Sequence, residues 1–116
     1  MTTDTPDGVD LEMFQEMQEL MEEDFPLLLE TFLDDTPVLL AQINDANSAG
    51  NPEGLTAAAH QLKSTSASLG FTVLENLGSQ LEAIGSGEDS GDAALLYEQV
   101  QANYTQLTPF LTAHLD

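Results

Sequence analysis

The residues with the most evident chemistry lie in one short stretch, AAAHQLKSTSASLG, at positions 57–70. His60 is one of two histidines, and Lys63, three positions later, is the only lysine or arginine in the chain. An imidazole nitrogen can act as a nucleophile near neutral pH, and an ammonium group can pair with the oxygens of an anion. Together the two residues indicate chemistry on an anionic group such as a phosphoryl group.

Helical geometry places His60 on the outer face of its segment. On a helix with about 100° per residue, the apolar side of residues 55–69 lies opposite the histidine. The predicted core stripe on that side consists of Leu55, Ala58, Leu62, Thr65 and Leu69. Apart from Lys63, the side chains within about 60° of His60 are small, which leaves room for a partner surface to approach the imidazole. These small neighbours are Thr56, Ala57, Ser64 and Ala67.

The segment after Gly70 is predicted to form a return helix that carries Glu82 at the level of His60. Gly70 can end the first helix, because glycine readily adopts the left-handed conformation found at helix C-termini. In an antiparallel hairpin, Glu82 could accept a hydrogen bond from one ring nitrogen and leave the other facing outward. The alternative interpretation is that Glu82 is simply a solvated carboxylate. Gln80, on the opposite border of the same apolar arc, is the weaker candidate.

Five helical segments are predicted to position these residues. Apolar residues recur at steps of three and four, without clean strand alternation. The segments are residues 11–21, 26–47, 52–69, 72–84 and 92–115. Pro37 predicts either a kink or a break in the second segment, and the unbroken apolar stripe favours a kink. Short connections between helices predict an all-α fold, namely an antiparallel four-helix bundle with an additional N-terminal helix. We expect this domain to cover residues 10–116 and residues 1–9 to be disordered.

Composition restricts the class of partner. The chain has 116 residues, 21 of them acidic, and a formal net charge of -20. Such a surface repels nucleic acid phosphates and anionic membranes and favours partners with a positive rim, although solubility or adaptation to high salt explains it equally well. The chain has no cysteine, which excludes disulfides and thiolate chemistry. Without a signal-like start or an apolar run near the roughly 20 residues of a membrane span, we expect a soluble, cytoplasmic protein.

Several other chemistries find little support in the sequence. Neither histidine has another at the third or fourth position after it, so no metal site is expected. No glycine-rich phosphate loop occurs, so the chain is not expected to bind ATP and phosphorylate its own histidine. Ser64 and Ser68 lie on the same helix as His60 without a buried acid behind the imidazole, so a hydrolase triad is not expected. His114, near the C-terminal end, is expected to be incidental.

Three stretches together resemble one known family. AHQLKSTSASLG resembles the signature of histidine-containing phosphotransfer (HPt) domains: a histidine, an aliphatic residue two positions later, a lysine, a run of small residues and an aliphatic-glycine pair. LENLGSQLE is similar to the next bundle helix of these domains, and EEDFPLLLETFL to the long preceding helix of single-domain members. The resemblance implies a four-helix bundle that shuttles phosphoryl groups between receiver domains.

The resemblance also implies roles for individual residues. His60 would accept a phosphoryl group from a receiver aspartate and pass it to another, and Lys63 would stabilise that group. Glu82 stands where relatives often have a glutamine that orients the ring. Ser64 departs from the family's usual glycine, but a serine is small enough for binding to survive. The expected partners are the receiver domains of a hybrid sensor kinase and of a response regulator, which would supply Mg²⁺. They would dock around His60. The chain itself is expected to be a monomer and to need no cofactor.

Two other classes of function stay open at this stage. An acidic helical adapter or nucleic-acid mimic would bind basic partners without chemistry. Its binding would collapse with added salt and would ignore substitution of His60. A helical-bundle hydrolase or metalloprotein has no support beyond the histidine itself.

Overall fold

The computed structural model describes Pro6 and residues 8–115, and this part of the chain is almost entirely helical. Its elements are α1 (Leu11–Met21), a short 3-10 turn η1 (Glu22–Asp24), α2 (Phe25–Ala49), α3 (Pro52–Leu69), α4 (Thr72–Ser86) and α5 (Ala93–Ala113). The only β-type pairing among the described residues is an isolated bridge between Val9 and Phe71. The predicted all-α class is confirmed.

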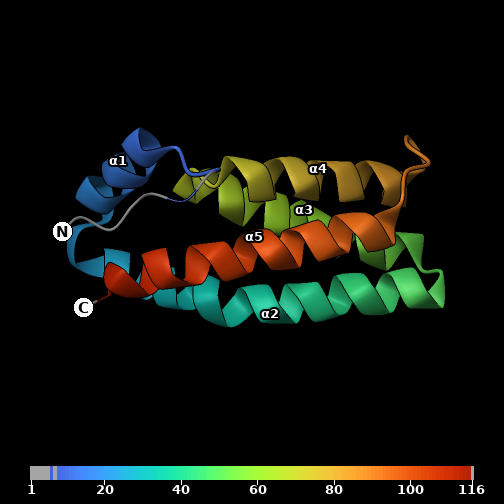
Figure 1. The fold of residues 1–116 in the computed structure, drawn as a ribbon, viewed down its shortest axis with the longest axis horizontal. Helices are drawn as coiled ribbons and strands as arrows, with labels where there is room; N and C mark the ends of the chain where they lie inside the picture. The colour runs from blue at the N-terminus through green and yellow to red at the C-terminus, as the bar shows by residue number, and fades with distance from the viewer. Residues whose placement is uncertain (1–5, 7, 116) are drawn as a thin grey trace.

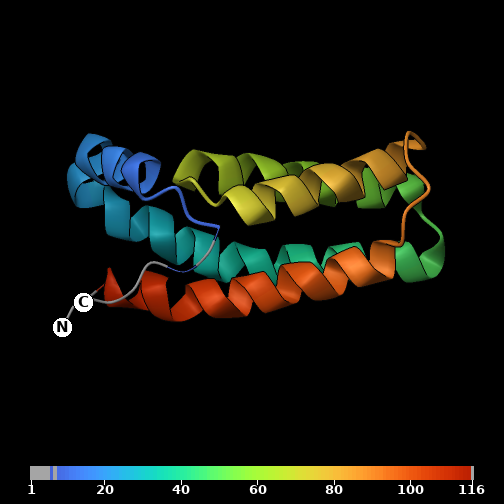
Figure 2. The ribbon, with the colours of Figure 1, turned by 45° about the horizontal axis from the view of Figure 1, so that its top comes forward.

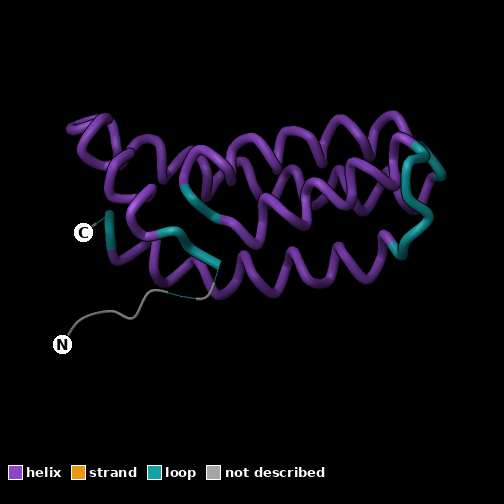
Figure 3. Tube along the Cα trace, turned by 90° about the horizontal axis from the view of Figure 1, so that it is seen from above, coloured by secondary structure: helices purple, strands orange, loops and turns teal. Residues whose placement is uncertain are grey.

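The four long helices run side by side along the longest axis, and α1 lies across one end (Figures 1 and 2). The connections from α2 to α3 and from α3 to α4 are two residues each, so that consecutive helices are antiparallel neighbours. Seen from above, the α2–α3 and α4–α5 connections lie together at one end, whereas the α3–α4 turn and the segment before α1 lie inward of the other end (Figure 3). The predicted four-helix bundle with an extra N-terminal helix is therefore confirmed.

Polar side chains fix where three helices begin. The carboxylate of Asp10 accepts a hydrogen bond from the backbone N–H of Met13 at 3.2 Å, and Asp92 caps α5 in the same way at 3.1 Å. The amide oxygen of Asn51 caps α3 through the N–H of Gly54 at 3.1 Å. These caps satisfy N–H groups that have no partner inside the helix, which explains why the predicted starts lie within one or two residues of the observed ones.

Helix α2 continues through Pro37 as a single helix. Proline has no N–H, so the carbonyl oxygen of Leu33, four residues earlier, loses its usual helical donor. The hydroxyl of Tyr104 on α5 donates to this oxygen instead, at 2.9 Å. Burial and the nearby charge of Asp34 raise the pKa of Tyr104, so the phenol keeps its proton and acts as the donor. A long-range hydrogen bond thus replaces the local one that the proline removes.

Gly8 and Val9 contact the start of α4. Gly8 and Val9 belong to the stretch that was expected to be disordered, but the carbonyl of Gly8 accepts a hydrogen bond from the N–H of Thr72 at 2.8 Å, and Val9 pairs with Phe71. Turn-like composition alone does not predict these contacts with the start of α4. Residues 1–5 and 7 lie outside the described residues.

An aromatic cluster joins α1 to the end of the bundle. The ring of Phe14 lies 5.2 Å from that of Phe25 and 5.0 Å from that of Phe110, measured between centroids. His114 packs against the same cluster, 4.6 Å from Phe110, and its Nδ1 lies 2.8 Å from the carbonyl oxygen of Phe110. Edge and tilted aromatic contacts of this kind stabilise a core beyond simple area burial. His114 is thus part of the packing at this end.

The Tyr104 hydrogen bond can be tested by Tyr104→Phe. We expect the free energy of unfolding to fall by about 1 kcal/mol, because the carbonyl of Leu33 is left without a donor. The matched control is Tyr97→Phe on the same helix, whose hydroxyl only accepts from the exposed side chain of Gln101. Urea denaturation followed by circular dichroism measures both variants. An equal loss in the two would contradict the special role of Tyr104.

Candidate functional site

The site depends on the close approach of α3 and α4 at Gly78. A Cβ atom on this glycine would lie 3.0 Å from the backbone nitrogen of Lys63 and 3.2 Å from the carbonyl oxygen of Ala59. Both neighbours are backbone atoms, so a larger residue would force the helices apart. Glu82 follows Gly78 by four residues, about one helical turn, and is therefore held close to the outward side chains of α3.

The burial of α3 differs from the predicted stripe at three positions. Leu55, Ala58, Leu62 and Leu69 are buried as expected. Thr65, which was predicted to belong to the core stripe, is only half-buried, whereas Ala59 and Ser66 are fully buried. Helical spacing gives the direction of the apolar side but not which neighbouring helix comes closest. Here α4 packs so tightly at Gly78 that it covers the Ala59 side of α3.

His60, Lys63 and Glu82 form one hydrogen-bonded group. The Nδ1 atom of His60 lies 2.7 Å from one carboxylate oxygen of Glu82, and the Nζ atom of Lys63 donates to the other oxygen at 3.0 Å. The His60 side chain is 61% exposed, whereas that of Glu82 is only 24% exposed. The more buried carboxylate of Glu82 thus holds the accessible imidazole of His60 from one side.

The charge of Glu82 fixes the tautomer of His60. Hydrogen bonds from Lys63 and then from His60 lower the pKa of Glu82 from 4.5, so the carboxylate is ionised at neutral pH. An ionised carboxylate can only accept hydrogen bonds, so Nδ1 of His60 must carry the hydrogen. The Nε2 atom of the neutral ring then keeps its lone pair. Nε2 is therefore the atom available as a nucleophile.

The four small residues predicted around His60 lie on the face of α3 that carries it, with different exposure. Ala57 and Ser64 are exposed, and Thr56 and Ala67 are half-buried. The hydroxyl of Thr56 donates to the carbonyl oxygen of Pro52 at 2.8 Å, and its side chain packs against Gly85 of α4. Thr56 is thus partly occupied in the contact between α3 and α4, whereas Ala57 and Ser64 present open surface.

Sequence reasoning did not single out an open polar cavity of about 340 Å³ on the α4 side of the site. Lys63 and Glu82 form part of its wall, together with Ser79, Ser86 and Glu88. The cavity gives the Lys63 side chain space to move without disturbing the helix contact at Gly78. In the sequence, only Ser79 and Ser86, seven residues apart on one helix, point to this cavity, and the indication is weak.

The described residues contain no cluster of three or more histidine or acidic side chains that could hold a metal ion. At the site itself, the ammonium of Lys63 already occupies one oxygen of Glu82. A cation in that position opposes the binding of a metal ion. A search of the described helices also finds none that is long and apolar enough to cross a membrane.

Comparison with known proteins agrees with this geometry. The family described as Hpt domain matches residues 27–109, which include His60, Lys63 and Glu82. The crystal structure of histidine-containing phosphotransfer protein B (HptB) from Pseudomonas aeruginosa PAO1 is similar over 96% of both chains, with a TM-score of 0.89 and 25% sequence identity. A search of curated proteins found no match.

The hydrogen-bonded group predicts how Glu82 titrates. In Lys63→Ala the pKa of Glu82 is expected to rise toward 4.5, because the largest cause of its lowering is removed. The measurement is a pH titration of the side-chain carboxyl carbon of Glu82 by NMR. The same titration on the unsubstituted chain should give a pKa of Glu82 below 4.5. Identical titration of Glu82 with and without Lys63 would show that the ion pair does not form in solution.

Proposed function

Because the chain belongs to the Hpt domain family, we propose that it is a cytoplasmic phosphorelay intermediate that carries a phosphoryl group on His60. The group would come from the aspartyl phosphate of one receiver domain and pass to the aspartate of another. The observation that carries the proposal is the hydrogen bond of 2.7 Å between Nδ1 of His60 and Glu82 on an otherwise exposed ring. This hydrogen bond holds the ring in one orientation and leaves Nε2 free to react.

The proposed reaction is a direct displacement at phosphorus. The Nε2 lone pair of His60 attacks the phosphorus atom, and the bond between phosphorus and the aspartate oxygen breaks, so that the receiver carboxylate leaves. The ring gains positive charge, and the Nδ1–H hydrogen bond to the Glu82 carboxylate stabilises that charge. In the return step a receiver carboxylate oxygen attacks phosphorus and the bond to Nε2 breaks. No proton has to leave Nδ1 in either direction.

Lys63 is proposed to stabilise the transferred group. Its ammonium lies 3.0 Å from Glu82 in the resting site, and Lys63 is the only lysine or arginine that this chain can offer to phosphoryl oxygens on His60. Charge-assisted hydrogen bonds to such oxygens are stronger than neutral ones. The open cavity beside Lys63 lets the side chain turn from the carboxylate toward the phosphoryl group.

The remaining chemistry is assigned to the partners. We expect the receiver domains, one from a hybrid sensor kinase and one from a response regulator, to bring Mg²⁺ and the charges that stabilise phosphoryl transfer. The chain itself is proposed to need no cofactor and to have no kinase activity. Receiver docking is assigned to the surface around His60 formed by Thr56, Ala57, Ser64 and Ala67.

The acceptor assignment can be tested with His60→Gln. Incubation of the unsubstituted chain with a phosphorylated receiver should give an acid-labile, base-stable label, and His60→Gln should abolish it. The control is His114→Gln, which removes the second histidine and should keep the label, provided that circular dichroism shows both variants folded. Persistent labelling of His60→Gln would refute the assignment. Absence of any label on the unsubstituted chain would instead favour an adapter that binds without chemistry.

The role of Lys63 predicts a slower reaction in Lys63→Ala. A charge-assisted hydrogen bond is worth about 1.5–3 kcal/mol, so transfer is expected to slow by roughly tenfold to a hundredfold, or the phosphohistidine to decay correspondingly faster. Lys63→Arg keeps the positive charge and should lose less. Single-turnover transfer with purified receivers measures both directions. Unchanged rates in both directions would remove Lys63 from the mechanism.

A further inference from the structure

The hydroxyl group of Ser64 lies beside His60 and has no part in the proposed reaction. Ser64 follows His60 by four residues on α3, and its side chain is exposed. Residues four apart are neighbours on the surface of a helix, with about 5–6 Å between their Cβ atoms. Helical side chains also tilt toward the N-terminus of their helix, so Ser64 is directed back toward the turn that carries His60. A hydroxyl group is thus held next to the proposed acceptor.

The other hydroxyl groups of α3 are either occupied or buried. Those of Thr56, Thr65 and Ser68 donate to backbone carbonyl oxygens of the same helix, at 2.8, 3.1 and 3.0 Å. The hydroxyl of Ser66 is buried. The hydroxyl of Ser64 makes no hydrogen bond to another residue that the structure describes. A serine that does not donate to its own helix can donate to a group that arrives from outside.

Ser64 and Lys63 lie on opposite sides of His60. With about 100° per residue, Lys63 lies about 60° to one side of His60 and Ser64 about 40° to the other. The Lys63 side faces α4, because the backbone of Lys63 lies against Gly78 and its ammonium contacts Glu82. The Ser64 side therefore faces away from α4. A group bound to the imidazole would have a cation on one side and a hydroxyl group on the other.

The orientation of the His60 ring favours the Ser64 side. Glu82 holds Nδ1 of His60 from the α4 side, at 2.7 Å. The two nitrogens of an imidazole ring point in diverging directions, so Nε2 is directed away from Glu82 and from α4. Oxygens of a phosphoryl group on Nε2 are therefore displaced from α4 toward the side that carries Ser64.

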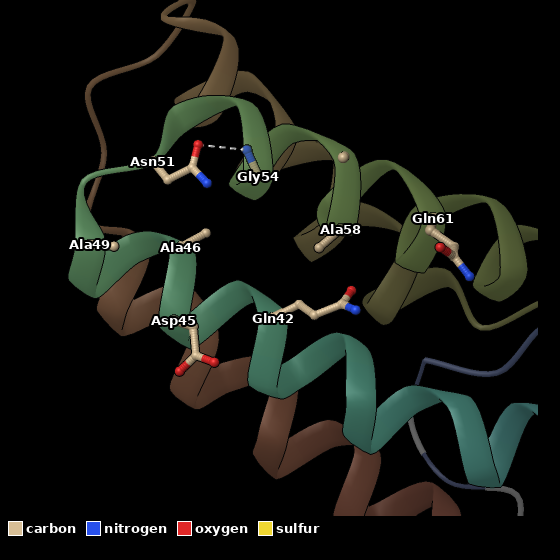
Figure 4. Close-up of a pocket in the computed structure, with 9 residues that line it drawn as sticks. Gln42, Asp45, Ala46, Ala49, Asn51, Gly54, Ala58 and Gln61 are labelled. Atoms are coloured by element: carbon tan, nitrogen blue, oxygen red, sulfur yellow. Dashed lines mark hydrogen bonds between the residues drawn. The ribbon is translucent and has the colours of Figure 1, made fainter.

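The other α3 side chains on this side of His60 do not offer a donor to such a group. Ala57 has no polar atom in its side chain. Gln61 lines a cavity of about 470 Å³ between α2 and α3, with Gln42 on the opposite wall (Figure 4). The Gln61 side chain thus belongs to the seam between the two helices. Ser64 is left as the α3 residue that can donate to the group on this side.

We propose that the hydroxyl group of Ser64 donates a hydrogen bond to a phosphoryl oxygen on Nε2 of His60 and so stabilises the phosphorylated state. The inference rests on the proposed function and adds a second donor to Lys63. The hydroxyl group keeps its proton, and no bond to Ser64 forms or breaks. Ser64 would thus increase the share of phosphoryl groups that this chain holds at equilibrium with a receiver domain.

The test measures how phosphoryl groups divide between the chain and a purified receiver domain at equilibrium, before either phosphate hydrolyses. Ser64→Ala should shift this equilibrium toward the receiver by about threefold to tenfold, the size expected for one exposed hydrogen bond. Ser64→Gly should give the same shift, because it also removes the hydroxyl group. The matched control is Ser68→Ala, which removes an exposed hydroxyl group that already donates to a backbone carbonyl. It should leave the equilibrium unchanged.

An equilibrium measurement separates stabilisation of the phosphoryl group from docking of the receiver. A change in docking alters the forward and reverse rates together and leaves the ratio of the free phosphorylated proteins the same. An unchanged ratio in Ser64→Ala would overturn the role of Ser64 and leave the phosphotransfer function standing. A shift in Ser64→Ala without one in Ser64→Gly would also overturn it, because the methyl group would then be the cause. Failure of every receiver domain of the host to label the unsubstituted chain would overturn the function, and the role of Ser64 with it.

Discussion

The rest of the site depends on the distance between α3 and α4 at Gly78. With no side chain there, the backbone of α4 approaches Lys63 and Ala59 to within the space that a Cβ atom would need. One turn later, Glu82 comes within 3.0 Å of both His60 and Lys63. A wider spacing would leave the carboxylate in solvent and the imidazole free to rotate. A backbone contact thus determines the tautomer and orientation of a side chain.

The single lysine, Lys63, lies beside His60 on an otherwise strongly negative chain. With a net charge of -20, the chain repels free phosphates and nucleotides. Lys63 reduces this repulsion only near His60, and in the resting state its ammonium is paired with the carboxylate of Glu82. Under the proposed function, Lys63 would therefore act on a phosphoryl group that His60 carries. This arrangement suits a carrier that exchanges phosphoryl groups with docked partners.

Much of this arrangement could be predicted from the sequence, because it depends on local rules. Caps, glycines and 3-4 spacing located the helices, and counting along an antiparallel hairpin brought Glu82 to His60. The errors concern contacts between distant segments. Spacing alone could not reveal that Tyr104 replaces the donor missing at Pro37, 71 residues from its acceptor. It also could not reveal the pairing of Val9 with Phe71, or that α4 rather than solvent covers Ala59.

Small residues act differently on the two sides of α3. On the α4 side, Gly78 brings two backbones together and fixes the reactive group. On the α2 side, residues such as Ala46 and Ala58 do not fill the seam, and a groove stays open. His60 lies between the two sides. The open seam on the α2 side is thus separate from the hydrogen bonds that hold the ring on the α4 side.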